Sequence, residues 1–132
     1  MIVLDAVTVI AHLNPANVHH EAATAVMREA LPNNALIHPV TMAEVLVGPA
    51  RAGAAHTVYA ALLAEGIQIC TPESAQPQRV ADLRASSGLK LPDCYPLDTA
   101  EQTGSQLATF DHQLAKRAAQ RGVTVLGAPP SA

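Results

Sequence analysis

The sequence predicts a doubly wound α/β fold, a three-layer sandwich in which a central parallel sheet of four to five short strands lies between helices. Short apolar segments alternate along the chain with segments rich in helix-forming residues. The apolar segments lack polar alternation, as do the strands of a parallel sheet that is covered on both faces. Since 49% of the 132 residues are hydrophobic, one complete core can form. We therefore expect one domain over residues 1–127, followed by a loose tail at 128–132.

The first half of the chain begins with a strand and a helix that meet at Asp5. The apolar residues IVL end at that aspartate, and AVTVIAHL after it is compatible with a helix. Thr41 and Glu44 have the spacing of a capping box, so a helix is expected to begin at Thr41. Composition and the breakers Pro and Gly predict four further elements. These are a helix at 19–31, a strand at 35–38, a helix at 56–66 and a strand at 67–70.

The second half repeats this alternation of strands and helices. A helix is expected to start near Pro72 and to end at Gly88. Residues 89–104 are predicted to form a loop that enters a helix. The remaining predicted elements are a strand at 106–110, a helix at 111–122 and a strand at 123–126.

Composition and charge exclude several classes of protein. The net charge of −3 argues against a broadly basic nucleic-acid surface, although divalent cations bound by carboxylates would change the local sign. Cys70 and Cys94 stand singly, which indicates reduced thiols rather than a zinc site or a disulfide framework. The first apolar run lacks preceding basic residues and stops at Asp5, far short of a membrane span. We expect a cytoplasmic protein without a membrane segment.

Two acids follow predicted strands at the edge where such sheets bind ligands. Asp5 comes directly after the first strand and Asp111 directly after the fourth, so both are expected at the carboxyl edge of the sheet. Glu44 lies in the first turn of the helix after the second strand, and Asp93 lies at the start of a later helix. If the connections are short, all four acids converge at this edge.

Each acid also has a simpler explanation. Glu44 could be half of a capping box, and Asp93 could be a favourable charge at a helix N-terminus. Asp5 and Asp111 are harder to explain in this way, because an acid after a buried strand is costly unless it is paired. A divalent cation would pair with the whole cluster, and oxygen ligands without Cys or a His pair suit Mg²⁺ or Mn²⁺. The chemistry typical of such a site is phosphodiester hydrolysis by activated water.

Four segments around these acids resemble the PIN-domain family, in particular its VapC toxins. They are IVLDAVTVIAHL, TMAEVLVG, LKLPDCYPLDTAEQTG and LATFDHQLAKRA, and they occur in the family's order over nearly the whole chain. The resemblance implies a Mg²⁺- or Mn²⁺-dependent endoribonuclease, the toxin of a toxin–antitoxin pair, whose catalytic and metal-binding residues are Asp5, Glu44, Asp93 and Asp111. It also implies a homodimer, a VapB-like antitoxin that covers the active site, and a structured RNA substrate such as transfer or ribosomal RNA.

The chain departs from the family pattern in three places. Val7 stands where many members have a small hydroxyl side chain, although Thr8 is adjacent. Pro96 interrupts the helix after Asp93 and is tolerable in a first turn, which would make Asp93 about the cap. Asp98 replaces an apolar residue and is expected to be exposed or to support a metal ligand. The low aromatic content leaves three residues for base stacking: Tyr59, Tyr95 and Phe110.

Other functions of an α/β domain with clustered acids would require other residues. A haloacid-dehalogenase phosphatase would need an Asp at the position of Val7, and a phospho-receiver would need paired acids and a late Lys; neither pattern is present. A binding-only PIN-like module and an RNA-processing nuclease without an antitoxin remain open. His112, beside Asp111, is the histidine of most interest. Five basic residues could contact RNA phosphates or lie on solvated faces: Arg84, Lys90, Lys116, Arg117 and Arg121.

Overall fold

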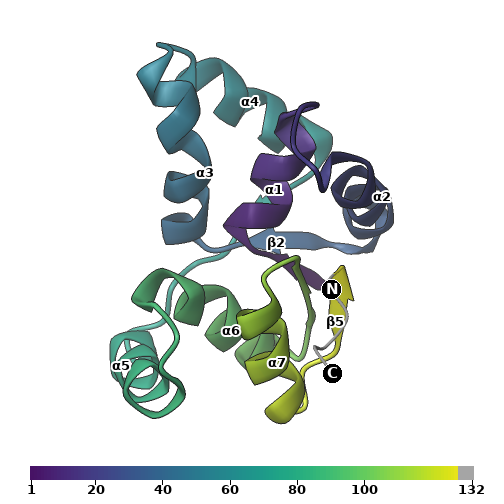
Figure 1. Ribbon diagram of the computed structural model, residues 1–132. Helices are drawn as coiled ribbons and strands as arrows, with labels where there is room; N and C mark the ends of the chain where they lie inside the picture. The colour runs from purple at the N-terminus through teal and green to yellow at the C-terminus, as the bar shows by residue number, and fades with distance from the viewer. Residues whose placement is uncertain (128–132) are drawn as a thin grey trace.

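The computed structural model describes residues 1–127, in which a five-stranded sheet lies between two layers of helices (Figure 1). The strands are β1 (Ile2–Leu4), β2 (Ala35–Ile37), β3 (Gln68–Ile69), β4 (Gln106–Thr109) and β5 (Val125–Gly127). The helices are α1 (Ala6–Leu13), α2 (His20–Ala30), α3 (Pro39–Arg51), α4 (Ala55–Glu65), α5 (Gln76–Ser87), α6 (Leu91–Thr103) and α7 (His112–Gln120), with a 3-10 turn at Leu31–Asn33. The predicted α/β class is confirmed, and the tail predicted at 128–132 lies outside the described residues.

The side chains of β1 divide the core into two halves. Ile2 and Leu4 pack against residues of α1 to α4, whereas Val3 packs against residues of α5 to α7. All three side chains are almost fully buried, as expected for a strand covered on both faces. Figure 1 shows the two layers, with α1 to α4 above the sheet and α5 to α7 below it.

The order of the strands reverses beside β1. The sheet runs β3-β2-β1-β4-β5, and every neighbouring pair is parallel. The chain therefore moves outward from β1 to β3, returns, and places β4 and β5 on the other side of β1. The backbone N–H of Asp5 donates to the carbonyl of Ala108 at 3.2 Å, so the ends of β1 and β4 meet at this reversal. Ligand sites in doubly wound sheets lie at such a point.

The capping box predicted for Thr41 and Glu44 is wrong. Helix α3 begins at Pro39, whose fixed φ favours a first helical position, and His38 is its N-cap. The Nδ1 atom of His38 accepts a hydrogen bond from the backbone N–H of Val40 at 3.0 Å. Thr41 is buried within the first turn, and Glu44 lies one turn further along the helix. Glu44 is therefore free of a capping role.

Helices α5 and α6 also differ from expectation. Helix α5 begins at Gln76 and not near Pro72. In α6, Lys90 is the N-cap, so Asp93 lies in the first turn and Pro96 lies beyond it, inside the helix. The prediction that Pro96 falls in a first turn capped near Asp93 is wrong. Asp98 is only 4% exposed, which contradicts one of the two roles expected for it, exposure, and leaves the other, support of a metal ligand, as a prediction.

Among residues 1–127, none of the helices combines the length and the apolar character needed to cross a bilayer.

Candidate metal centre

Asp5 and Asp111 each follow a strand and cap the next helix. The Oδ1 atom of Asp5 accepts a hydrogen bond from the N–H of Thr8 at 2.8 Å, and Oδ1 of Asp111 accepts one from the N–H of Leu114 at 3.0 Å. Both carboxylates therefore lie at helix N-termini, where the helix dipole favours negative charge. Because β1 and β4 are neighbours, the two caps lie side by side at the carboxyl edge of the sheet.

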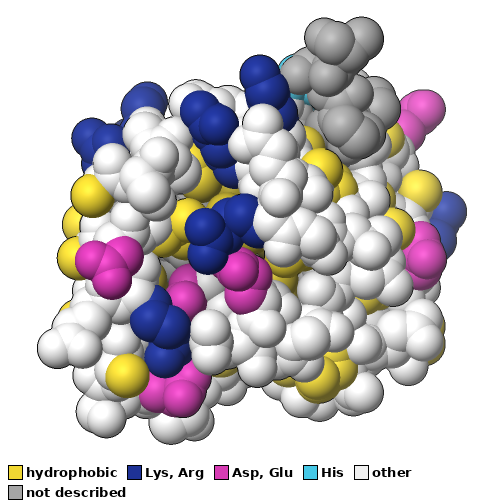
Figure 2. All heavy atoms as spheres, turned by 90° about the horizontal axis from the view of Figure 1, so that it is seen from below, with side chains coloured by type: hydrophobic (Ala, Val, Ile, Leu, Met, Phe, Trp, Pro, Cys, Tyr) yellow, Lys and Arg dark blue, Asp and Glu magenta, His cyan; other side chains and the backbone are white. Residues whose placement is uncertain are grey.

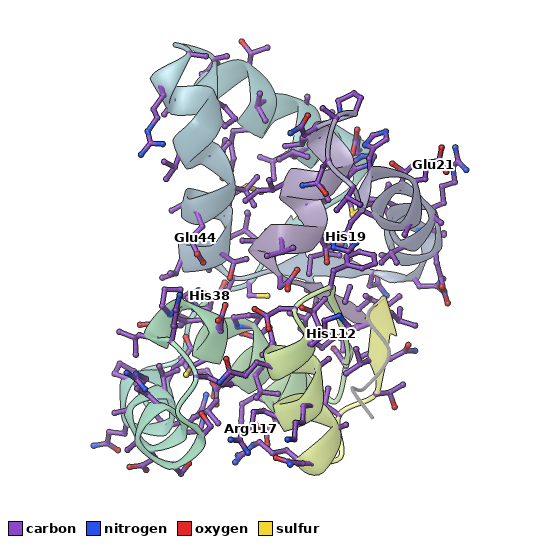
Figure 3. The ribbon with its side chains drawn as sticks, viewed as in Figure 1. His19, Glu21, His38, Glu44, His112 and Arg117 are labelled. Carbon is purple, nitrogen blue, oxygen red and sulfur yellow. The ribbon has the colours of Figure 1, made fainter. Side chains whose placement is uncertain are left out.

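Glu44 and Asp93 approach this edge from opposite layers. Glu44 lies in the second turn of α3, which follows β2, and Asp93 lies in the first turn of α6; both side chains are half-buried. The two helices pack against each other. Figure 3 shows Glu44 near the lower end of α3, toward the layer that contains α6 and α7. The fold thus brings the four acids that the sequence singled out to one edge of the sheet, where their charges affect one another.

The pKa values show that these carboxyl groups sense one another. Burial raises the pKa of Asp5 to about 6, and the charge of Asp93 adds to this rise, against hydrogen bonds from Thr109 and Thr8 that lower it. Burial raises the pKa of Glu44, with further contributions from the charges of Asp93 and Asp5. Burial and the charge of Asp111 raise the pKa of Asp93, which Lys90 partly offsets. Mutual repulsion therefore links all four acids.

The donor set fits a hard divalent cation in its chemistry. Within the described residues, none of the four carboxylates forms an ion pair with a Lys, Arg or His side chain. Their side chains also do not converge, in this part of the chain, as a ready-made set of three or more ligands. Mg²⁺ keeps several of its waters and needs only one or two direct carboxylates, so a loose arrangement of acids remains compatible with it.

A threonine from β4 connects the two capping acids. The Thr109 hydroxyl accepts a hydrogen bond from the N–H of Asp111 at 3.0 Å, and Thr109 also hydrogen bonds to the Asp5 carboxylate. Thr109 is fully buried, so both bonds lie away from water. Val7, where the family often has a hydroxyl, is 40% exposed. A hydroxyl from β4 therefore supports Asp5 in this chain. In the sequence, the only indication of this contact is that Thr109 lies two residues before Asp111.

A buried hydrogen-bonded chain beside the acids was missed by sequence reasoning. The Nε2 atom of His38 lies 2.8 Å from Oε1 of Gln76, and Nε2 of Gln76 donates to Asp98 at 3.1 Å. Arg79 donates to both carboxylate oxygens of Asp98, at 3.0 and 3.2 Å. The ring of Tyr95, two residues after Asp93, lies 4.6 Å from that of His38. This polar chain joins the start of α3 to α5 and α6, the helices that flank the acids.

We expect His38 to make stability depend on pH below neutrality. Burial lowers the pKa of His38, against the Gln76 hydrogen bond and the charge of Asp98, so the native state holds this imidazole neutral. A lowered native pKa gives a contribution that is present above pH ~6.5 and is lost as the pH falls through the native pKa. His38→Asn keeps a capping acceptor without titrating, so wild type should lose about 1 kcal/mol more than the variant between pH 7 and pH 5. Urea unfolding at both pH values measures this, and equal losses would contradict it.

Two of the five basic residues singled out by the sequence bond to neighbouring side chains. Arg121 donates to Glu101 at 2.7 Å, and Arg117 bonds to Gln120 at 3.0 Å. Figure 3 shows Arg117 at the end of α7 that is remote from Glu44. In Figure 2, which views the molecule from below, some Lys and Arg side chains lie against Asp and Glu side chains, and others lie near the upper edge without an acid beside them. A wide pocket of about 620 Å³ between α5 and α6 is lined by such paired charges. The contacts proposed for Arg84, Lys90 and Lys116 stay predictions.

The fold and the acid cluster define a class of protein: α/β domains that place carboxylates at the switch point of a parallel sheet. The PIN-domain profile matches residues 2–120, so the chain belongs to the PIN-domain family, a family of nucleases. No curated protein sequence matches the chain.

Solved structures share this fold. VapC20 of Mycobacterium tuberculosis, described as a toxin that cleaves the sarcin–ricin loop, is 15% identical with a TM-score of 0.73, over 87% of this chain and 93% of its own. FitAcB of Neisseria gonorrhoeae is 22% identical with a TM-score of 0.66, over 96% of both chains. FitAB bound to an IR36 DNA fragment is 20% identical with a TM-score of 0.70, over 96% of this chain and 94% of that one. At these identities the likeness establishes the fold alone.

Proposed function

We propose that this protein is an endoribonuclease that requires Mg²⁺ or Mn²⁺ and acts as the toxin of a toxin–antitoxin pair. The observation that carries the proposal is the cluster of four acids without ion-pair partners among residues 1–127, in which Asp5 has a pKa of about 6. A protein keeps such repelling carboxylates together at a cost in stability, and a divalent cation removes that cost. PIN-domain membership and the likeness to a toxin that cleaves RNA favour this use of the cluster.

In this proposal Asp5, Glu44, Asp93 and Asp111 hold the cation. When bound, one or two ions supply an activated water and stabilise the leaving oxygen of the phosphodiester. Thr109 keeps Asp5 and Asp111 oriented through its two hydrogen bonds. The caps at Thr8 and Leu114 anchor the same two carboxylates to α1 and α7. Two of the four acids are therefore held at helix N-termini, and the cation would draw Glu44 and Asp93 toward them.

The test is cleavage of total cellular RNA by the purified protein with Mg²⁺, with Mn²⁺ or with chelator. We expect discrete cuts that depend on metal and that disappear in Asp93→Asn. Glu21→Gln is the matched control, because Glu21 is an exposed carboxylate of α2, at the periphery of the molecule in Figure 3. Folded protein that cuts no RNA with either metal would favour a binding-only PIN-like module instead.

An apolar groove beside Glu44 supports an antitoxin partner. It has a volume of about 280 Å³, lies between α1 and α3, and is lined by Ile10, Leu13, Asn14, Glu44, Val45, Gly48 and Pro49. Ile10 and Leu13 are 39% and 38% exposed. We propose that an apolar antitoxin segment fills this groove and directs a basic side chain to the acids. The partner would be a VapB-like protein, and inhibition of cleavage by the product of the neighbouring reading frame tests this.

We further propose that the protein is cytoplasmic and a homodimer. The exposed apolar side chains of α1 and α3, Val7, Ile10 and Val47 among them, offer surface for both an antitoxin and a second copy of the chain. Sedimentation of the protein alone and with its antitoxin distinguishes these uses. The RNA class proposed is transfer or ribosomal RNA, and mapping of the cuts in total RNA decides between them.

A further inference from the structure

An exposed aromatic ring stacks on the residue that precedes Asp111 of the acid cluster. The imidazole of His19 stacks on Phe110, with ring centroids 5.1 Å apart and an angle of 15° between the ring planes. Phe110 directly precedes Asp111 in the chain. His19 is exposed, whereas Phe110 is only 9% exposed. One face of the His19 ring is therefore covered by Phe110, and the imidazole as a whole remains open to solvent.

The His19 ring is held in place by the packing of Phe110 and by hydrogen bonds of the His19 backbone. Phe110 packs against Ala11 of α1 and against Ala23 and Val26 of α2, so it is a fixed support. The backbone N–H of His19 donates to Oδ1 of Asn17 at 2.8 Å, and its carbonyl accepts from the N–H of Ala23 at 2.8 Å. His19 thus stands on an ordered turn at the start of α2.

For a residue at the N-cap of a helix, the stacking of the His19 side chain on Phe110 is unusual. His19 is the N-cap of α2, where Ser, Thr, Asp or Asn would bond to a free backbone N–H. Its side chain makes no capping hydrogen bond in the described part of the chain and instead lies flat on Phe110. Next to it, Val18 is 91% exposed. This turn therefore presents apolar and aromatic surface where helix stability alone would favour a small polar residue.

The other aromatic residues are already occupied. Tyr59 packs against the core on the α1 to α4 side, and Tyr95 lies against His38. In Figure 3, His19 lies at the lower edge of the layer formed by α1 and α2, and His112, which follows Asp111, lies at the start of α7 below it. Of the aromatic pairs in the described residues, the one formed by His19 and Phe110 has an exposed ring, and one of its members is adjacent in the chain to a site acid.

We propose that the His19 ring, backed by Phe110, is a stacking platform for one unpaired base of the RNA next to the cleaved phosphate. This rests on the proposed nuclease function and adds a residue that selects its substrate. Phe110 is adjacent to Asp111 in the chain, with Cα atoms about 3.8 Å apart, so the residue that supports the ring is anchored beside a site acid. Stacking on aromatic rings is a common way to hold single-stranded RNA, because every base has a flat face and only an unpaired base can offer it.

The test compares binding of a short unpaired oligoribonucleotide by proteins that cannot cut it. In the Asp93→Asn background, His19→Ala should weaken binding about tenfold, His19→Tyr should restore it, and His56→Ala, on the distant helix α4, should have no effect. An abasic nucleotide beside the cut should weaken binding by the His19 protein and leave the His19→Ala protein unchanged. In the cutting protein, His19→Ala should raise KM with kcat little changed.

The outcomes separate this proposal from the proposed function. The platform is wrong, even when the protein cuts RNA, in either of two cases. The first is that His19→Ala binds the oligoribonucleotide as tightly as His56→Ala, and the second is that the abasic nucleotide weakens binding equally in the His19 and His19→Ala proteins. If His19 and the base prove coupled while wild type cuts no RNA, the platform stands and the nuclease proposal fails. Absence of RNA binding by any of these proteins overturns both. Thermal unfolding of each variant shows whether the change merely disturbs the turn at Asn17.

Discussion

Asp5→Asn should abolish RNA cleavage and yet stabilise the protein in the absence of metal. The loss of cleavage should be at least about 100-fold, because a neutral amide replaces a charged ligand. The gain in stability follows from the burial of Asp5, which is 4% exposed and has a pKa of about 6. Asn retains the oxygen that caps α1 at Thr8, so the helix keeps its N-terminal hydrogen bond.

The sign of this effect follows from proton linkage. The native pKa of Asp5 lies above its unfolded value, so the contribution of the protonated side chain is present below pH ~4 and is lost as the pH rises through about 6. At pH 7 without metal, wild type should therefore be less stable than Asp5→Asn by up to about 3 kcal/mol, and the difference should shrink toward pH 4. Saturating Mg²⁺ or Mn²⁺ should stabilise wild type and not the variant.

Thermal unfolding with chelator and with metal, at pH 7 and pH 4, measures both effects. Glu21→Gln serves as control because it removes one exposed carboxylate of α2 and leaves the cluster intact. A variant that melts below wild type in chelator at pH 7 would show that Asp5 has a cationic partner in the native state. Retained cleavage would remove Asp5 from the metal centre.

Asp98→Leu should destabilise the protein by about 2 to 4 kcal/mol, the largest loss that we expect from a single residue outside the acid cluster. Asp98 accepts hydrogen bonds from Gln76 and twice from Arg79, and its side chain is 6% exposed. Without it, the buried amide of Gln76 loses an acceptor, and the Arg79 guanidinium, 28% exposed, loses its main partner. The exposure of Arg79 places the expected loss below that of a fully buried pair.

A second substitution separates the charge from the packing. Adding Arg79→Leu to Asp98→Leu should recover part of the stability, because removal of both partners leaves no uncompensated charge. The matched control is Glu101→Gln, three residues further along α6, whose partner Arg121 is 44% exposed. This exposed pair should contribute about 1 kcal/mol or less. Urea unfolding measures all four proteins, and equal losses for Asp98→Leu and Glu101→Gln would contradict a structural role of the buried pair.

The fold class was predictable because its signals are local in the chain. Each strand is a short apolar run beside a helix-forming segment, and this alternation has few solutions other than a covered parallel sheet. The placement of Asp5 and Asp111 was predictable for the same reason, since Asp5 directly follows β1 and Asp111 follows β4 after one residue, Phe110. Topological rules then bring both to the same edge.

The start of α3 was not predictable from local pattern. Thr41 and Glu44 match a capping box. The helix nevertheless begins at Pro39 with the His38 side chain as its N-cap, three residues before the predicted cap. The competing cap depends on the neutral state of His38, which burial favours against the opposing effect of its hydrogen bond to Gln76. Tertiary packing therefore decided between two helix starts that the sequence allows.

By itself, the sequence determined the order of strands and helices and the family, and it singled out the four acids proposed for the site, because each of these depends on residues that are adjacent or regularly spaced. Only the tertiary structure decided that Asp98 is buried against Arg79, that Thr109 supports Asp5, and that His19 lies on Phe110. These partners come from elements that are distant in the chain; His38 and Gln76, for example, are 38 residues apart. Contacts of this kind form when the layers close over the sheet, so no local pattern predicts them.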